Sequence, residues 1–120
     1  MATVAATETS FDQLTASEGI VLVDFWAAWC GPCRMFAPTF EAASQRHPEI
    51  TFAKVDTEAE TGLAARFGIM SIPTLMAFRD GILLFAQPGA LPAPALEDLI
   101  GQLLELDMDQ VRAEVAKVGA

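Results

Sequence analysis

The chain has 120 residues, of which 52% are hydrophobic and 19% are charged, so it can bury a core as one domain and does not have the composition of a disordered chain. Its formal net charge of −9 repels phosphate backbones, and we expect no nucleic-acid partner. No apolar run reaches the roughly 18 residues of a membrane helix, and the N-terminus lacks the basic and apolar regions of a secretory signal. We therefore expect no membrane insertion and a cytoplasmic location, where thiols are kept reduced.

The first half of the chain predicts strands alternating with helices. A short strand is expected near residues 3–6, and Ser10 with Gln13 has capping-box spacing before a short helix at 11–17. Residues 20–26 are β-branched and aromatic with little alternation, which predicts a strand buried on both faces. Apolar residues then recur at helical spacing and predict a long helix that ends near Gln45.

The second half continues the alternation. Residues 50–55 predict another buried strand, and Thr57 with Glu60 repeats the capping-box spacing before a helix that ends at Gly68. Two strands, at 74–78 and 82–85, are joined through Asp-Gly, which is a strong hairpin signal. An apolar stripe over 96–106 predicts a final helix. Strands separated by helices pair in parallel through right-handed crossovers, so the fold class is α/β, with one mixed sheet and helices on both faces.

The last segment forms a separate prediction. Asp107 and Gln110 have capping spacing, and Met108, Val111 and Val115 follow at helical spacing. We expect a domain at residues 1–106 and a C-terminal helical extension at 107–120 that packs on the same domain. A monomer is the expected oligomeric state.

Cys30 and Cys33 are the only cysteines, and they flank Gly31-Pro32 where a predicted strand meets a predicted helix. They are too close in sequence to staple distant parts of the fold. A helix N-terminus offers free N–H donors and partial positive charge, which lower the pKa of a thiol and favour the attacking thiolate. Cys30 is then expected to attack a substrate disulfide, and the more buried Cys33 to resolve the mixed disulfide. Structural zinc would need two further ligands, and the single histidine, His47, is distant in sequence.

Two charged residues have alternative interpretations. Asp24 lies inside the most apolar strand, so it is either exposed on an edge strand or a buried carboxyl group with a raised pKa that exchanges protons with Cys33. Lys54 is either its charge partner or an exposed lysine at a strand end. Trp26 and Trp29 are most simply aromatics of the core or of the site rim.

Several motifs occur here in a combination known from one family. They are Trp29-Cys30-Gly31-Pro32-Cys33 with Asp24 ahead of it, Lys54-Val55-Asp56, Ile72-Pro73-Thr74, Asp80-Gly81 and Gly89-Ala90. On these motifs, residues 11–104 resemble the thioredoxin family. The resemblance implies the thioredoxin fold, with a central mixed β-sheet of five strands flanked by four α-helices.

The resemblance also implies a function. It predicts a general protein disulfide reductase that acts on disulfide-containing substrate proteins. A flavin-dependent thioredoxin reductase that uses NADPH would recycle it, and the chain itself would need no cofactor and no metal. The alternatives are a redox-quiet binding module on the same scaffold and, less in keeping with Gly31-Pro32, a disulfide oxidant.

The resemblance assigns roles to individual residues. Cys30 is the nucleophile, Cys33 the resolving thiol and Asp24 the buried acid–base group. Pro73 becomes a cis-proline that faces Cys30, whereas the frequency of X–Pro bonds alone favours trans. The implied substrate-docking rim consists of Trp29, Gly31, Pro32, Ile72, Pro73, Gly89 and Ala90, with Lys54 and Trp26 in supporting positions. Met70 and Ser71 depart from the usual basic residue and glycine, which bears on the choice of partner.

Overall fold

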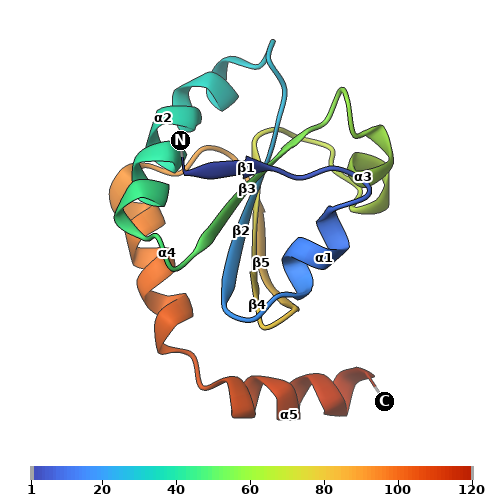
Figure 1. The fold of residues 1–120 in the computed structure, drawn as a ribbon, viewed down its shortest axis with the longest axis vertical. Coiled ribbons are helices and arrows are strands. Elements are labelled where there is room, and N and C mark those ends of the chain that lie inside the picture. Colours follow the sequence, from blue (N-terminus) through green and yellow to red (C-terminus); the bar gives the residue numbers. More distant parts are fainter. Residues whose placement is uncertain (1, 120) are drawn as a thin grey trace.

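A five-stranded mixed sheet forms the centre of the chain in a computed structural model that describes residues 2–119, with the backbone alone described at 119 (Figure 1). The strand order is β1-β3-β2-β4-β5. Strand β3 pairs in parallel with β1 and β2, whereas β4 pairs antiparallel with β2 and β5. The strands are β1 (Thr3–Ala5), β2 (Ile20–Trp26), β3 (Thr51–Asp56), β4 (Thr74–Arg79) and β5 (Ile82–Pro88). The fold class predicted from the sequence is confirmed.

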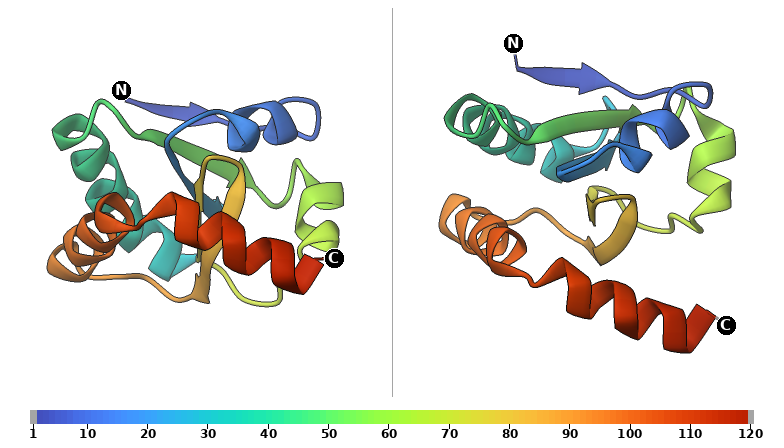
Figure 2. Two further views of the ribbon diagram at one scale, coloured as in Figure 1. Left: turned by 90° about the horizontal axis from the view of Figure 1, so that it is seen from below. Right: turned by 60° about the horizontal axis from the view of Figure 1, so that its bottom comes forward.

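Helices cover both faces of the sheet (Figures 1 and 2). They are α1 (Phe11–Ala16), α2 (Gly31–Arg46), α3 (Thr61–Arg66), α4 (Ala93–Glu105) and α5 (Met108–Gly119). One apolar cluster joins Leu22 to residues of α2 and α4, and a second joins Val23 to residues of α1 and α3. Alternate side chains of β2 therefore enter opposite cores, which explains why the strand is apolar at every position except Asp24.

The two ends of the sheet differ in what they carry. Phe25 pairs with Thr74, so β2 ends where β4 begins, and α2 starts from this end (Figure 1). The opposite end carries the β4–β5 hairpin, whose turn residues Asp80 and Gly81 have φ angles of 53° and 82°. The Asp80 side chain also accepts a hydrogen bond from the backbone N–H of Gly19, at 2.8 Å. The predicted Asp-Gly hairpin is confirmed.

Asp107 caps α5 as predicted, since its carboxylate accepts hydrogen bonds from the backbone N–H groups of Asp109 and Gln110, whereas the capping boxes predicted at Ser10 and Thr57 are wrong. The Ser10 side chain makes no cap of α1 and instead accepts a hydrogen bond from the backbone N–H of Thr7. Thr57 donates its hydroxyl proton to the carbonyl of Trp26, and α3 begins only after Glu60, which forms no side-chain cap. In both cases the hydroxyl fixes a loop that precedes the helix, because serine and threonine satisfy turns as readily as helix ends.

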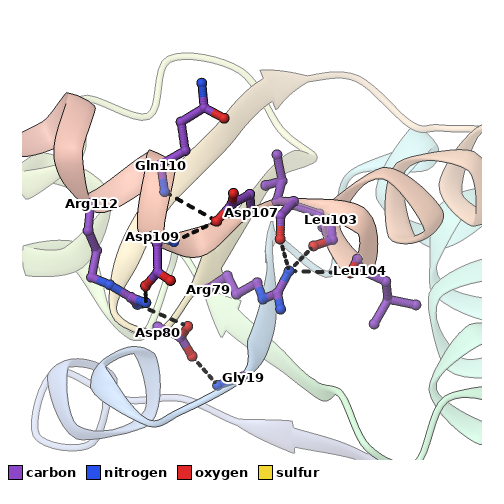
Figure 3. Close-up of polar contacts among 10 residues, drawn as sticks. Gly19, Arg79, Asp80, Leu103, Leu104, Asp107, Asp109, Gln110 and Arg112 are labelled. Atoms are coloured by element: carbon purple, nitrogen blue, oxygen red, sulfur yellow. Dashed lines mark hydrogen bonds and ion pairs between the residues drawn. The ribbon is translucent and has the colours of Figure 1, made fainter.

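The described residues contain five helices, whereas the resemblance implied four, because the tail after Leu106 is also helical. Figure 3 shows the junction of α4 with α5. Arg79 donates hydrogen bonds to the carbonyl groups of Leu103 and Leu106, at 2.6 and 3.2 Å, at the end of α4. Met108 is buried, and Arg112 lies 3.6 Å from the carboxylate of Asp80. Within residues 2–119, no helix is long and apolar enough to cross a membrane.

Candidate active site

Cys30 and Cys33 lie at the start of α2, shortly after the end of β2. Cys30 is the N-cap of α2, and its Sγ accepts a hydrogen bond from the backbone N–H of Cys33, at 3.1 Å. Pro32 occupies the first turn, where a missing N–H costs no hydrogen bond. The two cysteines are joined by a disulfide, with their Cα atoms 5.2 Å apart. The predicted position of the pair, at the electropositive end of a helix, is confirmed.

The rim of the site is exposed to solvent, whereas the two cysteines are buried. Trp29 is 68% exposed, and Gly31 and Pro32 are exposed as well. Cys30 is 4% and Cys33 2% exposed, so in the oxidised protein both are buried and Cys33 is only slightly the more buried. The disulfide ties both sulfurs to the same turn, which accounts for their similar burial.

A loop from the distant part of the chain completes the site. The Ile72–Pro73 peptide bond is cis, as the resemblance implied, and Ile72 packs against the cysteine pair. The Ile72 carbonyl oxygen lies 3.6 Å from Cys30 Sγ; this is a contact and not a hydrogen bond while the sulfur is oxidised. Pro73 accepts a hydrogen bond from the backbone N–H of Gly89 at 2.8 Å. The fold thus brings Gly89 to the loop, with Ala90 exposed beside it.

Asp24 is buried in the middle of the sheet. Its strand is central and its side chain is fully inaccessible, so the alternative of an exposed edge residue is wrong. Burial raises the pKa of Asp24 to about 7, and the positive charge of Lys54 only partly opposes this. Lys54 lies opposite Asp24 on β3, and its Nζ is 5.0 Å from the ring centroid of Trp26. Lys54 is therefore positioned as the charge partner rather than as an exposed strand end.

Glu58 is a neighbour of the site that the sequence interpretation missed. Its carboxylate accepts a hydrogen bond from the indole Nε1 of Trp29, at 2.9 Å. Glu58 follows the end of β3, which is parallel to β2, so the turn after β3 lies beside the turn that carries Trp29. The carboxyl ends of parallel strands meet at one edge of a sheet, and this rule could have identified Glu58.

Two sulfurs that bond across one helical turn can accept two electrons and return them, so the chain is a thiol–disulfide oxidoreductase. Within the described residues, no group of three or more His, Cys, Asp or Glu side chains could hold a metal ion. Residues 2–102 match the family model described as Thioredoxin. The chain belongs to the thioredoxin family.

Similar proteins cover almost the whole chain. A Streptomyces coelicolor protein provisionally named thioredoxin 2 is 55% identical over 115 residues, which cover 96% of this chain and 86% of that protein. The thioredoxin of Bacillus subtilis is 43% identical over 87% of this chain and all of its own length. A solved structure of a mutant thioredoxin from Halobacterium salinarum superimposes with a TM-score of 0.78 at 35% identity, covering 87% of this chain and 91% of that one.

Family membership together with the intact cysteine pair establishes the activity. The protein is a protein disulfide reductase of the thioredoxin kind. Thioredoxins in general act with a thioredoxin reductase and with disulfide-containing substrates.

Proposed function

We propose that this chain is a general, cytoplasmic protein disulfide reductase that works as a monomer and is recycled by a thioredoxin reductase. The observation that carries the proposal is the Cys30–Cys33 pair at the N-terminus of α2, and Asp24 is buried in β2, the strand that leads to it. The flavin and the NADPH of the cycle belong to the reductase. The chain itself contributes only its two sulfurs and the groups that move protons.

The sulfur chemistry proceeds in two exchanges. The Cys30 thiolate attacks one sulfur of the substrate disulfide, forming a mixed disulfide and releasing the first substrate thiolate. Cys33 then attacks Cys30 Sγ, the mixed disulfide breaks, and the second substrate sulfur leaves with the bonding electron pair. The substrate gains two electrons, and the chain ends with the disulfide seen in the structure.

Asp24 is proposed as the proton acceptor of the second exchange. Cys33 attacks as a thiolate, so its proton must be removed. A carboxyl group with a pKa of about 7 is about half ionised near neutral pH, and can both take and return that proton. An exposed aspartate with an ordinary pKa would be a weaker base.

Substrate docking is proposed along the loop before β4. The backbone of Ile72 is available to pair with an extended substrate segment, which is a short form of strand addition. The exposed ring of Trp29 offers an apolar contact on the other side of Cys30. Gly31, Pro32, Gly89 and Ala90 extend this rim, and the two glycines and the alanine leave a substrate backbone room to approach.

Insulin reduction driven by NADPH and a bacterial thioredoxin reductase tests the proposal. The wild-type chain should turn over, Cys30→Ser should be inactive, and Cys33→Ser should accumulate a mixed disulfide through Cys30 that mass spectrometry detects. If the wild type and Cys30→Ser were equally inactive while a partner protein still bound, the chain would be a binding module. A reduction potential well above roughly −200 mV would instead indicate a disulfide oxidant, because thioredoxin itself lies near −270 mV.

A further inference from the structure

An apolar pocket lies beside the start of β4, on the face of the sheet opposite α2. Two cross-strand pairs line it, Thr74 with Pro88 and Met76 with Ala86. The segment that connects α3 to β4, residues 67–71, lines it as well. Met76 belongs to the apolar cluster under α1 and α3, whereas α2 packs on the other cluster. The pocket is therefore distinct from the space around the cysteine pair.

The pocket adjoins the proposed docking rim at two places. Ser71 lines the pocket and precedes Ile72, which packs against the cysteine pair. Pro88 lines the pocket and precedes Gly89, whose backbone N–H donates to the carbonyl of Pro73 at 2.8 Å. A substrate segment that pairs with the backbone of Ile72 therefore passes within reach of the pocket.

The size and the lining of the pocket define what it can accept. Its volume is about 210 Å³, below the roughly 300–1,000 Å³ of pockets that hold whole small molecules, so a single side chain is the better fit. Ten of the described residues line it, and none of these ten is charged. The Thr74 hydroxyl donates to the carbonyl of Ser71 at 2.6 Å, so that proton is not available to a substrate. Burying a charge here would be unfavourable, and an apolar side chain is the matching occupant.

Met70 lines the same pocket and is exposed to solvent. Its side chain is 94% exposed, so it adds almost no burial to the protein's own core. Met76, which lines the pocket from β4, is only 4% exposed. Methionine is unbranched, and its polarisable thioether adapts to apolar partners of different shapes. Met70 therefore offers a movable apolar contact to a docked segment, beside a pocket that is already apolar.

We propose that Met70 and this pocket select substrates, and that they favour a disulfide whose cysteine has an uncharged aliphatic residue two positions away. The inference rests on the proposed function and adds a substrate class to it. In an extended segment, residues two positions apart point the same way. When the substrate cysteine points at Cys30, such a residue also points at the protein, about 7 Å further along. Met70 and Ile72 are themselves two residues apart, which is the same reach along the chain.

Two peptide disulfides that differ in one residue type test the selection. Each is the symmetrical disulfide of the peptide Gly-Xaa-Ala-Cys-Ala-Xaa-Gly, in which Xaa is leucine or asparagine. The two residues are similar in size and both are uncharged, and Xaa stands on both sides so that the direction of binding does not matter. The measurement is the second-order rate constant for reduction of each disulfide by the fully reduced protein, followed by chromatography of the released peptide thiol.

We expect the wild type to reduce the leucine peptide about tenfold faster than the asparagine peptide, which is the discrimination typical of one aliphatic group in an apolar site. Met70→Gln makes the contact polar, and Ala86→Leu fills the pocket from the exposed edge strand. Both should lower the preference to within about twofold, whereas Met70→Leu should keep it. Met35→Gln is the matched control and should also keep it, because Met35 is 76% exposed but lies on α2 and does not line the pocket.

Equal rates for the two peptides in the wild type would overturn the inference, as would a preference that survives Met70→Gln or Ala86→Leu, or one that Met35→Gln abolishes equally. The preference compares two substrates on one protein, so a loss of folded protein in a variant cancels. Insulin reduction tests the proposed function separately. A wild type that reduces insulin and both peptides alike would keep the function and lose the selection, whereas one that reduces no disulfide would lose both.

Discussion

At the scale of single residues, Asp24 works against the stability of the fold that contains it. Its pKa is 3.8 in an unperturbed chain and about 7 in the folded protein, chiefly because of burial. An acid that binds its proton more tightly when folded weakens the folded state as the pH rises. The free energy of unfolding therefore falls as the pH rises from about 4 to 7. Above pH 7 the buried carboxylate is ionised, and the whole destabilising effect is present. A shift of this size corresponds to roughly 4 kcal/mol.

Asp24→Asn should remove this penalty. At about pH 2.5, well below both pKa values, the aspartate is neutral in both states, so the variant and the wild type should have similar free energies of unfolding. At pH 8.5 the variant should be more stable, by up to roughly 4 kcal/mol. Urea unfolding of the oxidised proteins at both pH values measures the difference, with Glu18→Gln as the control for loss of an exposed carboxylate. A stability gain that is equal at both pH values would contradict the burial of the charge.

The residues of the site differed in how far the sequence could determine them. The cysteine pair could be placed because Gly31-Pro32 ends the apolar strand pattern and proline is well tolerated in the first turn of a helix. The burial of Asp24 stayed open, since a single strand does not reveal whether it lies at the centre or the edge of a sheet. That information came from pairing with β3 on one side and β4 on the other. Glu58 was missed because its partner, Trp29, is reached only across that pairing.

At the scale of elements, the end of α4 depends on a side chain from the sheet. The last turn of α4 contains no basic residue, so its free carbonyl groups have no cation of their own helix. Arg79 of β4 supplies one, and its Nη1 donates to the carbonyl groups of Leu103, Leu106 and Leu104 at 2.6, 3.2 and 3.4 Å. This contact joins the sheet to α4 at the point where α5 begins.

Arg79→Met should therefore destabilise the protein more than Arg112→Met. The first variant loses hydrogen bonds from a charged group in a half-buried position, worth about 2 kcal/mol. The second loses only exposed ion pairs with Asp80 and Asp109, which solvent screens, so we expect a much smaller loss. Urea unfolding at neutral pH compares the two directly. Equal losses would show that the guanidinium of Arg79 does not stabilise the end of α4.

Element types were easier to predict than element ends. Apolar patterns together with capping and turn signals predicted every strand and helix of residues 2–106, including the doubtful strand β1. The starts of α1 and α3 were placed by capping boxes that do not form, because Ser10 and Thr57 bond to loop backbone. Hydroxyl side chains have several local partners available, and only the folded loop selects among them.

At the scale of the whole molecule, one end of the sheet contains the candidate active site and the other end contains the hairpin turn and the tail helix. The cysteine pair, the cis-proline loop and the exposed Trp29 gather where β2 ends and β4 begins. The hairpin turn and α5 lie at the opposite end (Figure 1). The parallel and antiparallel pairing of β2 produces this division, since it directs α2 and the loop before β4 to one end. The tail helix is accordingly remote from the reacting sulfurs.

A chain that ends at Leu106 should keep its activity and lose some stability. The tail is held at its start by the buried Met108 and by the pair of Arg112 with Asp80, and burial of a methionine side chain contributes about 2 kcal/mol. We expect the truncated chain to reduce insulin with a kcat/KM within roughly twofold of wild type, because its catalytic end is unchanged, while its free energy of unfolding falls by about 2 kcal/mol. Met108→Ala in the full chain is the matched variant and should reproduce most of the stability loss. A tenfold loss of activity on truncation, with Met108→Ala fully active, would assign residues 107–120 to the reaction and overturn the division of the chain at residue 106.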